Sequence, residues 1–324
     1  MRVLCLHGAG TSASIFEKQT GGCSPSIPSM PAYSQSQPED TFTELPLLAA
    51  FRALLPQDQY IFEFVDAPHA SGPAPGIGTL FSPPYYTFYR SQDASEVKAS
   101  HEWILQRLTA ARATGTPFDA LMCFSQGCAA AAGLIIQHQN ERPHEPLPFR
   151  AAVFICGGLP FNIFEELGLS VPQRAWDINQ ASAEDLHRKA GAVEQRVADI
   201  RALDPGARRR RVDGLWTDVE TLSHRATGSQ DDYDPKRLPQ LDNTDVFGLD
   251  LTRLPEGLAP QIPTVHVYGL KDPRYPSAIQ LASFCRGPRR VFDHNGGHEI
   301  PRNTPVSQEI SESLLWLRCQ IREV

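Results

Sequence analysis

The chain has 324 residues, of which 41% are hydrophobic and 21% charged, and its formal net charge is -7. This composition is typical of a globular protein long enough to bury one extensive core. The negative charge gives no reason to expect nucleic acid as the main partner, and no apolar stretch approaches the length that crosses a bilayer.

Cysteine usage and the first residues indicate a cytoplasmic protein. The seven cysteines are odd in number and have no CxxC spacing, which favours reduced thiols over a disulfide framework or a zinc site. Residues 1–20 contain neither a secretory apolar region nor a cleavage-like site. We therefore expect a cytoplasmic protein without a membrane partner.

Short apolar runs that end at glycine or proline recur along the chain, as expected of parallel strands buried on both faces. We predict strands at 2–6, 60–65, 120–124, 151–156, 264–268 and, from a weaker pattern, 290–292. Helical patterns fall at 47–55, at about 93–112, from about 126 onward and at 307–319. This alternation predicts an α/β fold, a mostly parallel sheet with helices on both faces, whose chemistry collects at the carboxyl ends of the strands.

Two regions depart from the alternation within what we interpret as one domain, residues 1–324. Residues 21–44 are rich in serine and proline, which predicts a surface insertion. Residues 161–258 lack convincing strands and contain a polar helix at about 183–203. We interpret 161–258 as a helical cap inserted over the carboxyl edge of the sheet, not as a second independent domain.

Ser125 stands where the apolar run 120–124 changes into an alanine-rich helix, with Gly127 two residues later. This pattern is typical of a sharp strand-to-helix turn that exposes a nucleophilic serine. Cys123 occupies the position of the first glycine of the usual G-x-S-x-G motif, so the motif is imperfect. The interpretation therefore depends on a base and a carboxylate elsewhere, because a serine hydroxyl alone is a poor nucleophile.

His298 and Asp272 are the candidates for the base and the carboxylate. His298 follows Gly296-Gly297 in a loop before the last predicted helix, and Asp272 follows the strand predicted at 264–268. The order serine, aspartate, histidine is that of α/β-hydrolase triads. His294 is the alternative base and Asp293 the alternative carboxylate, but Asp293 lies too close in sequence to His298 for the usual arrangement on separate loops.

Two backbone amides are expected to stabilise an oxyanion. The first is that of Gln126, directly after the serine, and the second is that of Ala9 in the loop after the first strand, with Gly10 as the alternative. His7 is expected to support this loop. None of these groups requires a metal or an organic cofactor.

Two further segments suggest binding functions, each with a structural alternative. The aromatic segment 81–89, including Phe81, Tyr85 and Tyr86, either forms the wall of an acyl pocket or packs the cap onto the sheet. The run Arg208 to Arg211 either docks an acidic acyl-carrier domain or is a solvated loop.

Several segments resemble the fungal serine hydrolases of the α/β-hydrolase superfamily: 4–12, 64–68, 75–78, 118–127, 266–273 and 296–301. The resemblance spans nearly the whole chain except 21–44 and much of 161–258, and it is specific for the catalytic groups, not for a substrate. It implies an acyl-enzyme mechanism acting on an ester or a thioester.

Such hydrolases often act on polyketides in secondary metabolism, so the first hypothesis is a thioesterase that releases an acyl chain from a carrier. An esterase acting on a free small-molecule ester is the second hypothesis. The third is a binding or non-hydrolytic role on a pathway intermediate.

Overall fold

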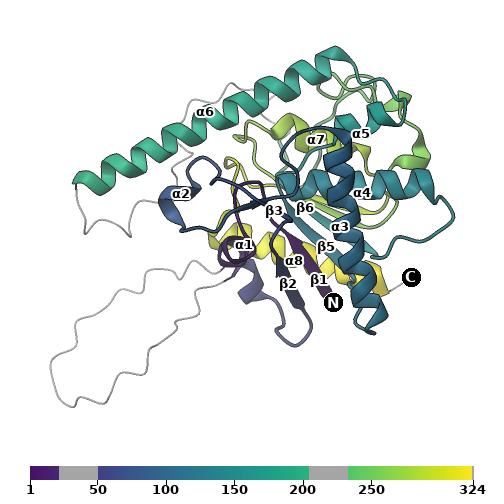
Figure 1. The fold of residues 1–324 in the computed structure, drawn as a ribbon, viewed down its shortest axis with the longest axis horizontal. Helices are drawn as coiled ribbons and strands as arrows, with labels where there is room; N and C mark the ends of the chain where they lie inside the picture. The colour runs from purple at the N-terminus through teal and green to yellow at the C-terminus, as the bar shows by residue number, and fades with distance from the viewer. Residues whose placement is uncertain (22–49, 204–232, 323–324) are drawn as a thin grey trace.

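A computed structural model describes residues 1–21, 50–203 and 233–322, in which one parallel sheet lies between two layers of helices (Figure 1). The strands of this sheet follow the order β2-β1-β5-β6-β7-β8, and every adjacent pair is parallel. They are β1 (Arg2–Leu6), β2 (Ile61–Val65), β5 (Ala120–Phe124), β6 (Ala151–Ile155), β7 (Thr264–Tyr268) and β8 (Arg289–Asp293). The predicted bounds of β1, β5 and β7 are confirmed, and those of the other three differ by one residue at one or both ends.

The central strands send alternate side chains to opposite faces of the sheet, as the two-residue period of a strand requires. In β5, Leu121 and Cys123 join the core cluster on one face, whereas Ala120, Met122 and Phe124 join the cluster on the other. Both faces are therefore apolar, which explains why β5 has an uninterrupted apolar sequence instead of an alternating one.

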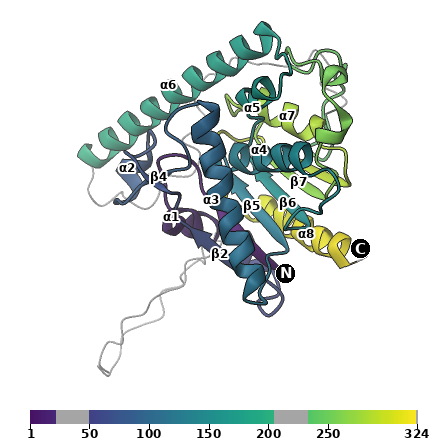
Figure 2. The ribbon, with the colours of Figure 1, turned by 45° about the vertical axis from the view of Figure 1, so that its right-hand side comes forward.

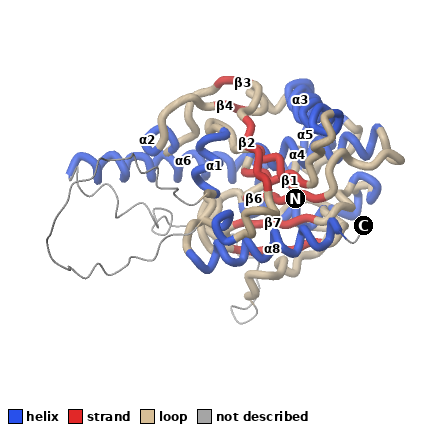
Figure 3. Tube along the Cα trace, turned by 90° about the horizontal axis from the view of Figure 1, so that it is seen from below, coloured by secondary structure: helices blue, strands red, loops and turns tan. Residues whose placement is uncertain are grey.

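Helices cover both faces of the sheet (Figure 3). The first layer contains α3 (Ala94–Ala113), α4 (Gln126–Glu141), α5 (Phe161–Glu166) and α7 (Tyr275–Phe284). The second layer contains α1 (Ala13–Thr20), α8 (Thr304–Arg322) and the short 3-10 helix η1 (Phe51–Leu54). None of the described helices is long and apolar enough to cross a membrane.

The helix predicted at 47–55 is wrong in its described part, where only the single turn η1 forms. Pro56 disfavours a helical conformation of the preceding residue, and Leu55 is accordingly extended, with ψ 148°. Residues 47–49 lie outside the described residues, as do residues 22–44 of the predicted insertion.

A long helix, α6 (Gln173–Leu203), crosses the molecule above the carboxyl ends of the strands (Figure 2). It begins ten residues before the predicted start at 183, directly after Pro172, and it packs against α7 and the short helix α2 (Ile77–Leu80). The described parts of 161–258 contain no strand of the main sheet; besides α5 and α6, they hold the 3-10 helices η4 (Leu251–Arg253) and η5 (Glu256–Leu258).

A two-stranded antiparallel sheet, β3 (His69–Ala70) with β4 (Tyr86–Thr87), lies beside the loop that follows β1. The aromatic segment that the sequence places in a loop thus includes a short strand. Strands of two residues are too short to give a periodic sequence pattern.

The chain reverses its winding direction at β1, because β2 lies on one side of this strand and β5 on the other. In an open α/β sheet, the carboxyl ends of two such strands border the crevice in which ligands bind. The loops after β1 and β5 are therefore the first place to examine for a site.

Candidate active site

Ser125 occupies the turn between β5 and α4 with an unusual backbone conformation, φ 51° and ψ -114°. A non-glycine residue in this region is strained and must be held there by its surroundings. The Ser125 amide donates to the carbonyl of Ile155 at 3.0 Å, which ties the turn to the end of β6.

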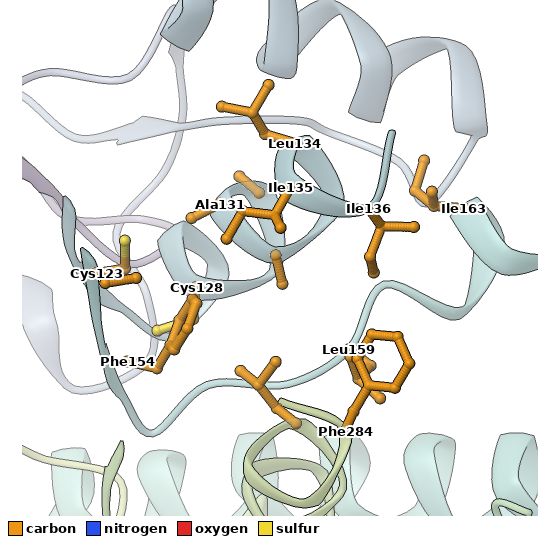
Figure 4. Packing of buried hydrophobic residues seen from close by; sticks show 14 of the residues in the cluster. Cys123, Cys128, Ala131, Leu134, Ile135, Ile136, Phe154, Leu159, Ile163 and Phe284 are labelled. Carbon is orange, nitrogen blue, oxygen red and sulfur yellow. The ribbon is translucent and has the colours of Figure 1, made fainter. Parts of the chain in front are cut away.

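Gly127 allows α4 to begin directly against β1. A Cβ atom at this position would lie 2.4 Å from the Leu6 carbonyl oxygen and 2.8 Å from that of His7. The second glycine of the serine motif is thus required by a close approach of two backbone segments. Cys123, at the position of the first glycine, is fully buried, and Figure 4 shows it with Cys128 among apolar side chains.

The fold brings Ser125, Asp272 and His298 together in one hydrogen-bond chain. His298 Nε2 lies 2.9 Å from Ser125 Oγ, and His298 Nδ1 lies 2.8 Å from Asp272 Oδ2. The second carboxylate oxygen of Asp272 accepts from the Arg274 amide at 2.8 Å. Each side chain comes from a loop after a different strand, β5, β7 or β8, so the sheet fixes their relative positions.

The Asp272 carboxylate is buried but remains the charged partner of His298. Burial by itself raises the pKa of Asp272, but the His298 ring and the hydrogen bonds from His298 and the Arg274 amide outweigh it and lower the pKa. An ionised carboxylate at Nδ1 favours the tautomer of His298 that leaves Nε2 as an acceptor toward Ser125.

Ala9 and Gln126 line the same cavity as Ser125. Gln126 is the first residue of α4, where amides have no partner within the helix, and among the described residues the Ala9 amide has no acceptor either. The alternative Gly10 amide is occupied, because it donates to the Tyr86 carbonyl at 2.9 Å. Ala9 is therefore the available donor in this loop.

His7 stabilises the loop after β1 through hydrogen bonds of its ring. Its Nδ1 donates to the Gly8 carbonyl at 2.7 Å, and its Nε2 accepts from the Ala67 amide at 3.0 Å. The Thr11 hydroxyl also donates to the Gly8 carbonyl at 2.7 Å. Burial lowers the pKa of His7, which agrees with a neutral ring in this position.

His294 and Asp293, the alternative base and carboxylate, form hydrogen bonds within the loops after β7 and β8, and neither is bonded to Ser125. His294 Nδ1 accepts from the Gly296 amide at 3.1 Å, and burial lowers the pKa of His294 to about 4. Asp293 Oδ1 accepts from the amides of Leu270 at 2.9 Å and Asn295 at 2.7 Å. Asp293 thereby ties the loop that carries Asp272 to the loop that carries His298.

A cavity of about 240 Å³ opens beside Ser125 and His298. Residues of the loop after β6, of α5 and of α6 line it, together with Tyr89 and Arg274. The lining side chains that project from α5 and α6 are those of Phe161, Trp176, Asn179, Ala183, Leu186 and His187.

The predicted substrate residues Phe81, Tyr85 and Tyr86 are not among the described residues that line this cavity. Tyr86 belongs to β4, and the Tyr85 hydroxyl donates to the Phe81 carbonyl at 2.6 Å, so the segment bonds with itself and with the loop after β1. Of the aromatic segment 81–89, only Tyr89 reaches the cavity.

The side chain of Gln126 has a function that the sequence did not indicate. Its Oε1 accepts from the Thr87 hydroxyl at 2.8 Å and the Phe88 amide at 2.9 Å, and its Nε2 donates to the Tyr89 carbonyl at 2.9 Å. The residue after the serine thus holds the wall segment 87–89 in place.

Cys156, Asp272 and His298 form the one group of possible metal ligands in the described part of the chain, with ligand atoms within 4.8 Å of one another. Asp272 and His298 already bond to each other, and burial together with the nearby Asp272 charge raises the pKa of the Cys156 thiol well above its usual value. A thiol is a poor metal ligand unless it is deprotonated, so these residues do not suit a cation. The predicted docking run Arg208 to Arg211 lies outside the described residues.

A parallel sheet with a serine on the sharp turn after β5, bonded to a histidine from the loop after β8, is the arrangement of an α/β-hydrolase. The chain belongs to the serine hydrolase (FSH1) family, whose model matches residues 1–174 and 242–310. It is therefore a hydrolytic enzyme, and the resemblance to the fungal serine hydrolases is confirmed.

Individual relatives are similar over most of the chain. "Hydrolase FUB4" of Fusarium oxysporum f. sp. lycopersici is 26% identical over 304 residues, which cover 93% of this chain and 92% of the relative. "Serine hydrolase cnsH" of Penicillium expansum is 27% identical over 258 residues, 76% of this chain and 94% of the relative. "Esterase alnB" of Emericella nidulans is 26% identical over 319 residues, 93% of this chain and 91% of the relative.

Solved structures with similar folds include two enzymes. A proline iminopeptidase of Mycobacterium smegmatis has a TM-score of 0.45 at 11% identity, with 100% of this chain and 91% of that chain covered. The RedJ thioesterase from the prodiginine biosynthetic pathway of Streptomyces coelicolor has a TM-score of 0.44 at 16% identity, with 98% and 90% covered.

Proposed function

We propose that the protein hydrolyses an acyl ester or thioester through an acyl-enzyme intermediate on Ser125. The observation that carries this proposal is the hydrogen-bond chain from Ser125 Oγ to His298 at 2.9 Å and from His298 to Asp272 at 2.8 Å. In this proposal Ser125 is the nucleophile, His298 the general base and acid, and Asp272 the group that orients the ring.

The reaction begins when His298 Nε2 takes the proton of Ser125 and Oγ attacks the carbonyl carbon. The carbonyl oxygen becomes an oxyanion, which accepts hydrogen bonds from the Ala9 and Gln126 amides. His298 then gives its proton to the departing alcohol or thiol, leaving an acyl group on Ser125. A water molecule, deprotonated by His298, attacks this acyl group and releases the acid. The loss of one oxyanion donor typically costs about 3 kcal/mol of transition-state stabilisation.

The cap is part of the proposal. We assign α5, α6 and the segment 233–258 to a cap on a single hydrolase domain, because α5 and α6 supply much of the cavity wall. Phe161, Trp176 and Leu186 give this wall an apolar surface suited to an acyl chain of the polyketide type. Six described cysteines are free, and five of them are buried, which supports the cytoplasmic location proposed here.

An active-site probe tests the nucleophile. A fluorophosphonate is expected to label the wild-type protein and to fail on Ser125→Ala, since the probe requires an activated serine. Ser71 provides a matched control, because its hydroxyl donates to the Gly72 carbonyl on an exposed loop, and Ser71→Ala should label like the wild type. Equal labelling of wild type and Ser125→Ala, or none of the wild type, would contradict the assignment.

The leaving group is tested separately. The esterase names of relatives support a free ester, whereas the resemblance to secondary-metabolite hydrolases supports a polyketide chain held as a thioester on an acyl-carrier domain. The kcat/KM values for one acyl chain, as a carrier-bound thioester and as its free ester, distinguish these two substrates. A labelled serine with turnover of neither would favour the binding role.

A further inference from the structure

Arg274 brings a positive charge to the wall of the proposed acyl site. It lies two residues after Asp272, at the start of α7, and its side chain borders the cavity. Its guanidinium is held from α6: Nη1 donates to the Asn179 carbonyl at 2.6 Å and to Ser182 Oγ at 2.7 Å, and Nη2 donates to Asn179 Oδ1 at 2.7 Å.

The Arg274 guanidinium forms no direct ion pair with a described carboxylate. In the described part of the chain, no carboxylate lies within ion-pair distance of the Arg274 guanidinium, and none of the residues lining the cavity is acidic. The Asp272 carboxylate acts on the Arg274 charge without forming an ion pair with the guanidinium, and its Oδ2 is bonded to His298. Burial lowers the pKa of Arg274 and the Asp272 charge opposes this effect, but a guanidinium stays protonated in proteins, so Arg274 brings a positive charge to the cavity wall.

The remaining donors of Arg274 are arranged as a fork. Nη1 uses both of its hydrogens and Nη2 uses one, which leaves Nε–H and the second Nη2–H without an acceptor among the described residues. In a planar guanidinium, Nε–H and the adjacent Nη2–H lie along one edge, which matches the two oxygens of one carboxylate. The bonds to Asn179 and Ser182 fix the plane in advance, so little side-chain freedom is lost on binding.

We propose that Arg274 binds a carboxylate carried by the substrate, so that the enzyme prefers acyl esters or thioesters with a free acid group. The inference rests on the proposed function and narrows its substrate class. An anionic group is the ligand that a half-buried, pre-oriented guanidinium without an ion-pair partner recognises best.

The test compares matched substrates. The p-nitrophenyl monoesters of succinic, glutaric and adipic acid carry the acid on the acyl side, and their methyl esters are neutral analogues of nearly equal size. A 4-carboxyphenyl ester of a neutral acid places the charge on the leaving side. The measured quantity is the ratio of kcat/KM for the acidic substrate to that for its neutral analogue. Comparing this ratio between the two kinds of substrate shows whether Arg274 binds a carboxylate on the acyl side or on the leaving-group side.

We expect this ratio to favour one acidic substrate in the wild type and to fall about 10- to 100-fold in Arg274→Gln, as the loss of a hydrogen-bonded charge pair predicts. Arg274→Lys keeps the charge but loses the fork, and its ratio should be intermediate. Arg289→Gln is the matched control, because Arg289 donates to two backbone carbonyls away from the cavity, and its ratio should equal that of the wild type.

Two outcomes would overturn the proposal. A wild type that hydrolyses neutral esters at least as well as every acidic one shows no carboxylate site, although the proposed hydrolase function would stand. An Arg274→Gln variant that loses activity on both members of a pair equally has a structural defect only.

Binding gives a readout that does not depend on hydrolysis. Calorimetry should detect glutarate or adipate binding to the wild type and to Ser125→Ala, but not to Arg274→Gln. If the fluorophosphonate and every ester fail while the diacid still binds through Arg274, the proposed function is wrong and the carboxylate site is right. If no diacid binds the wild type, the carboxylate site is wrong whatever the activity.

Discussion

Gly127→Ala gives a sharp test of the reasoning about the serine turn, because the added atom collides with backbone and not with a movable side chain. Its Cβ would lie 2.4 Å from the Leu6 carbonyl oxygen, whereas ordinary contact begins near 3.4 Å. The start of α4 must therefore move about 1 Å away from β1, and Ser125 and the Gln126 amide move with it.

A displacement of this size is expected to lower kcat/KM about 100-fold, because both the proposed nucleophile and one proposed oxyanion donor leave their positions. The free energy of unfolding should fall by about 1–3 kcal/mol from overpacking. Activity is measured with p-nitrophenyl butyrate and stability by urea unfolding, so that the two losses are read separately.

Gly191→Ala is the matched control. A Cβ on Gly191 meets no atom within 4 Å, and the residue lies within α6, so this variant should keep its activity and gain up to about 1 kcal/mol of stability from helix propensity. If Gly127→Ala retained kcat/KM within threefold of the wild type, the close approach of α4 and β1 would not be what positions Ser125.

Three further predictions follow from the site and the core. Asp272→Asn keeps the shape of the chain but removes the charge that orients His298, and it should lower kcat about 10⁴-fold with little change in KM; a loss below tenfold would remove Asp272 from the mechanism. Gln126→Ala releases the segment that carries Tyr89 and should raise KM several-fold while fluorophosphonate labelling persists, whereas an unchanged KM would show that this wall is held by other contacts. Burial lowers the pKa of His266 to about 3, so between about pH 6.5 and pH 3 the unfolded chain binds a proton there and the folded protein does not. The free energy of unfolding should therefore decrease as the pH is lowered through this range. His266→Phe should make this fall shallower by up to about 1.4 kcal/mol per pH unit in urea titrations, and parallel curves for the two proteins would contradict the assignment.

The elements that set the position of the site were predictable because their sequences carry a local signal. β5 is a continuous apolar run that ends at Ser125, and β1 and β7 are short, mainly apolar runs with a glycine within two residues of their ends. Ser125 and Asp272 follow two of these runs, and His298 follows the weaker pattern of β8. Their meeting in space is a consequence of the parallel sheet, which gathers the carboxyl ends of its strands at one edge.

The residues that line the cavity beside Ser125 carry no comparable local signal in the sequence. Asn179 and Leu186 lie on α6, more than fifty residues from Ser125 in sequence, and the sequence of this helix does not indicate which part of the molecule it covers. The aromatic segment was a reasonable candidate by composition, but its rings are used in β4 and in local bonds, and only Tyr89 reaches the cavity. Arg274 had one signal in the sequence, because it is a charged residue two positions after the loop aspartate Asp272.

Different elements of the fold supply the proposed catalytic groups and much of the cavity wall. The sheet edge carries Ser125 and His298, whereas α6 contributes Trp176, Leu186 and the groups that hold Arg274, none of which belongs to the hydrogen-bond chain of the serine. We therefore expect substitutions along α6 to change which substrate binds while the proposed catalytic groups stay the same. Replacing α6 with the corresponding segment of a relative is likewise expected to change the substrate preference of this enzyme without removing the proposed catalytic groups.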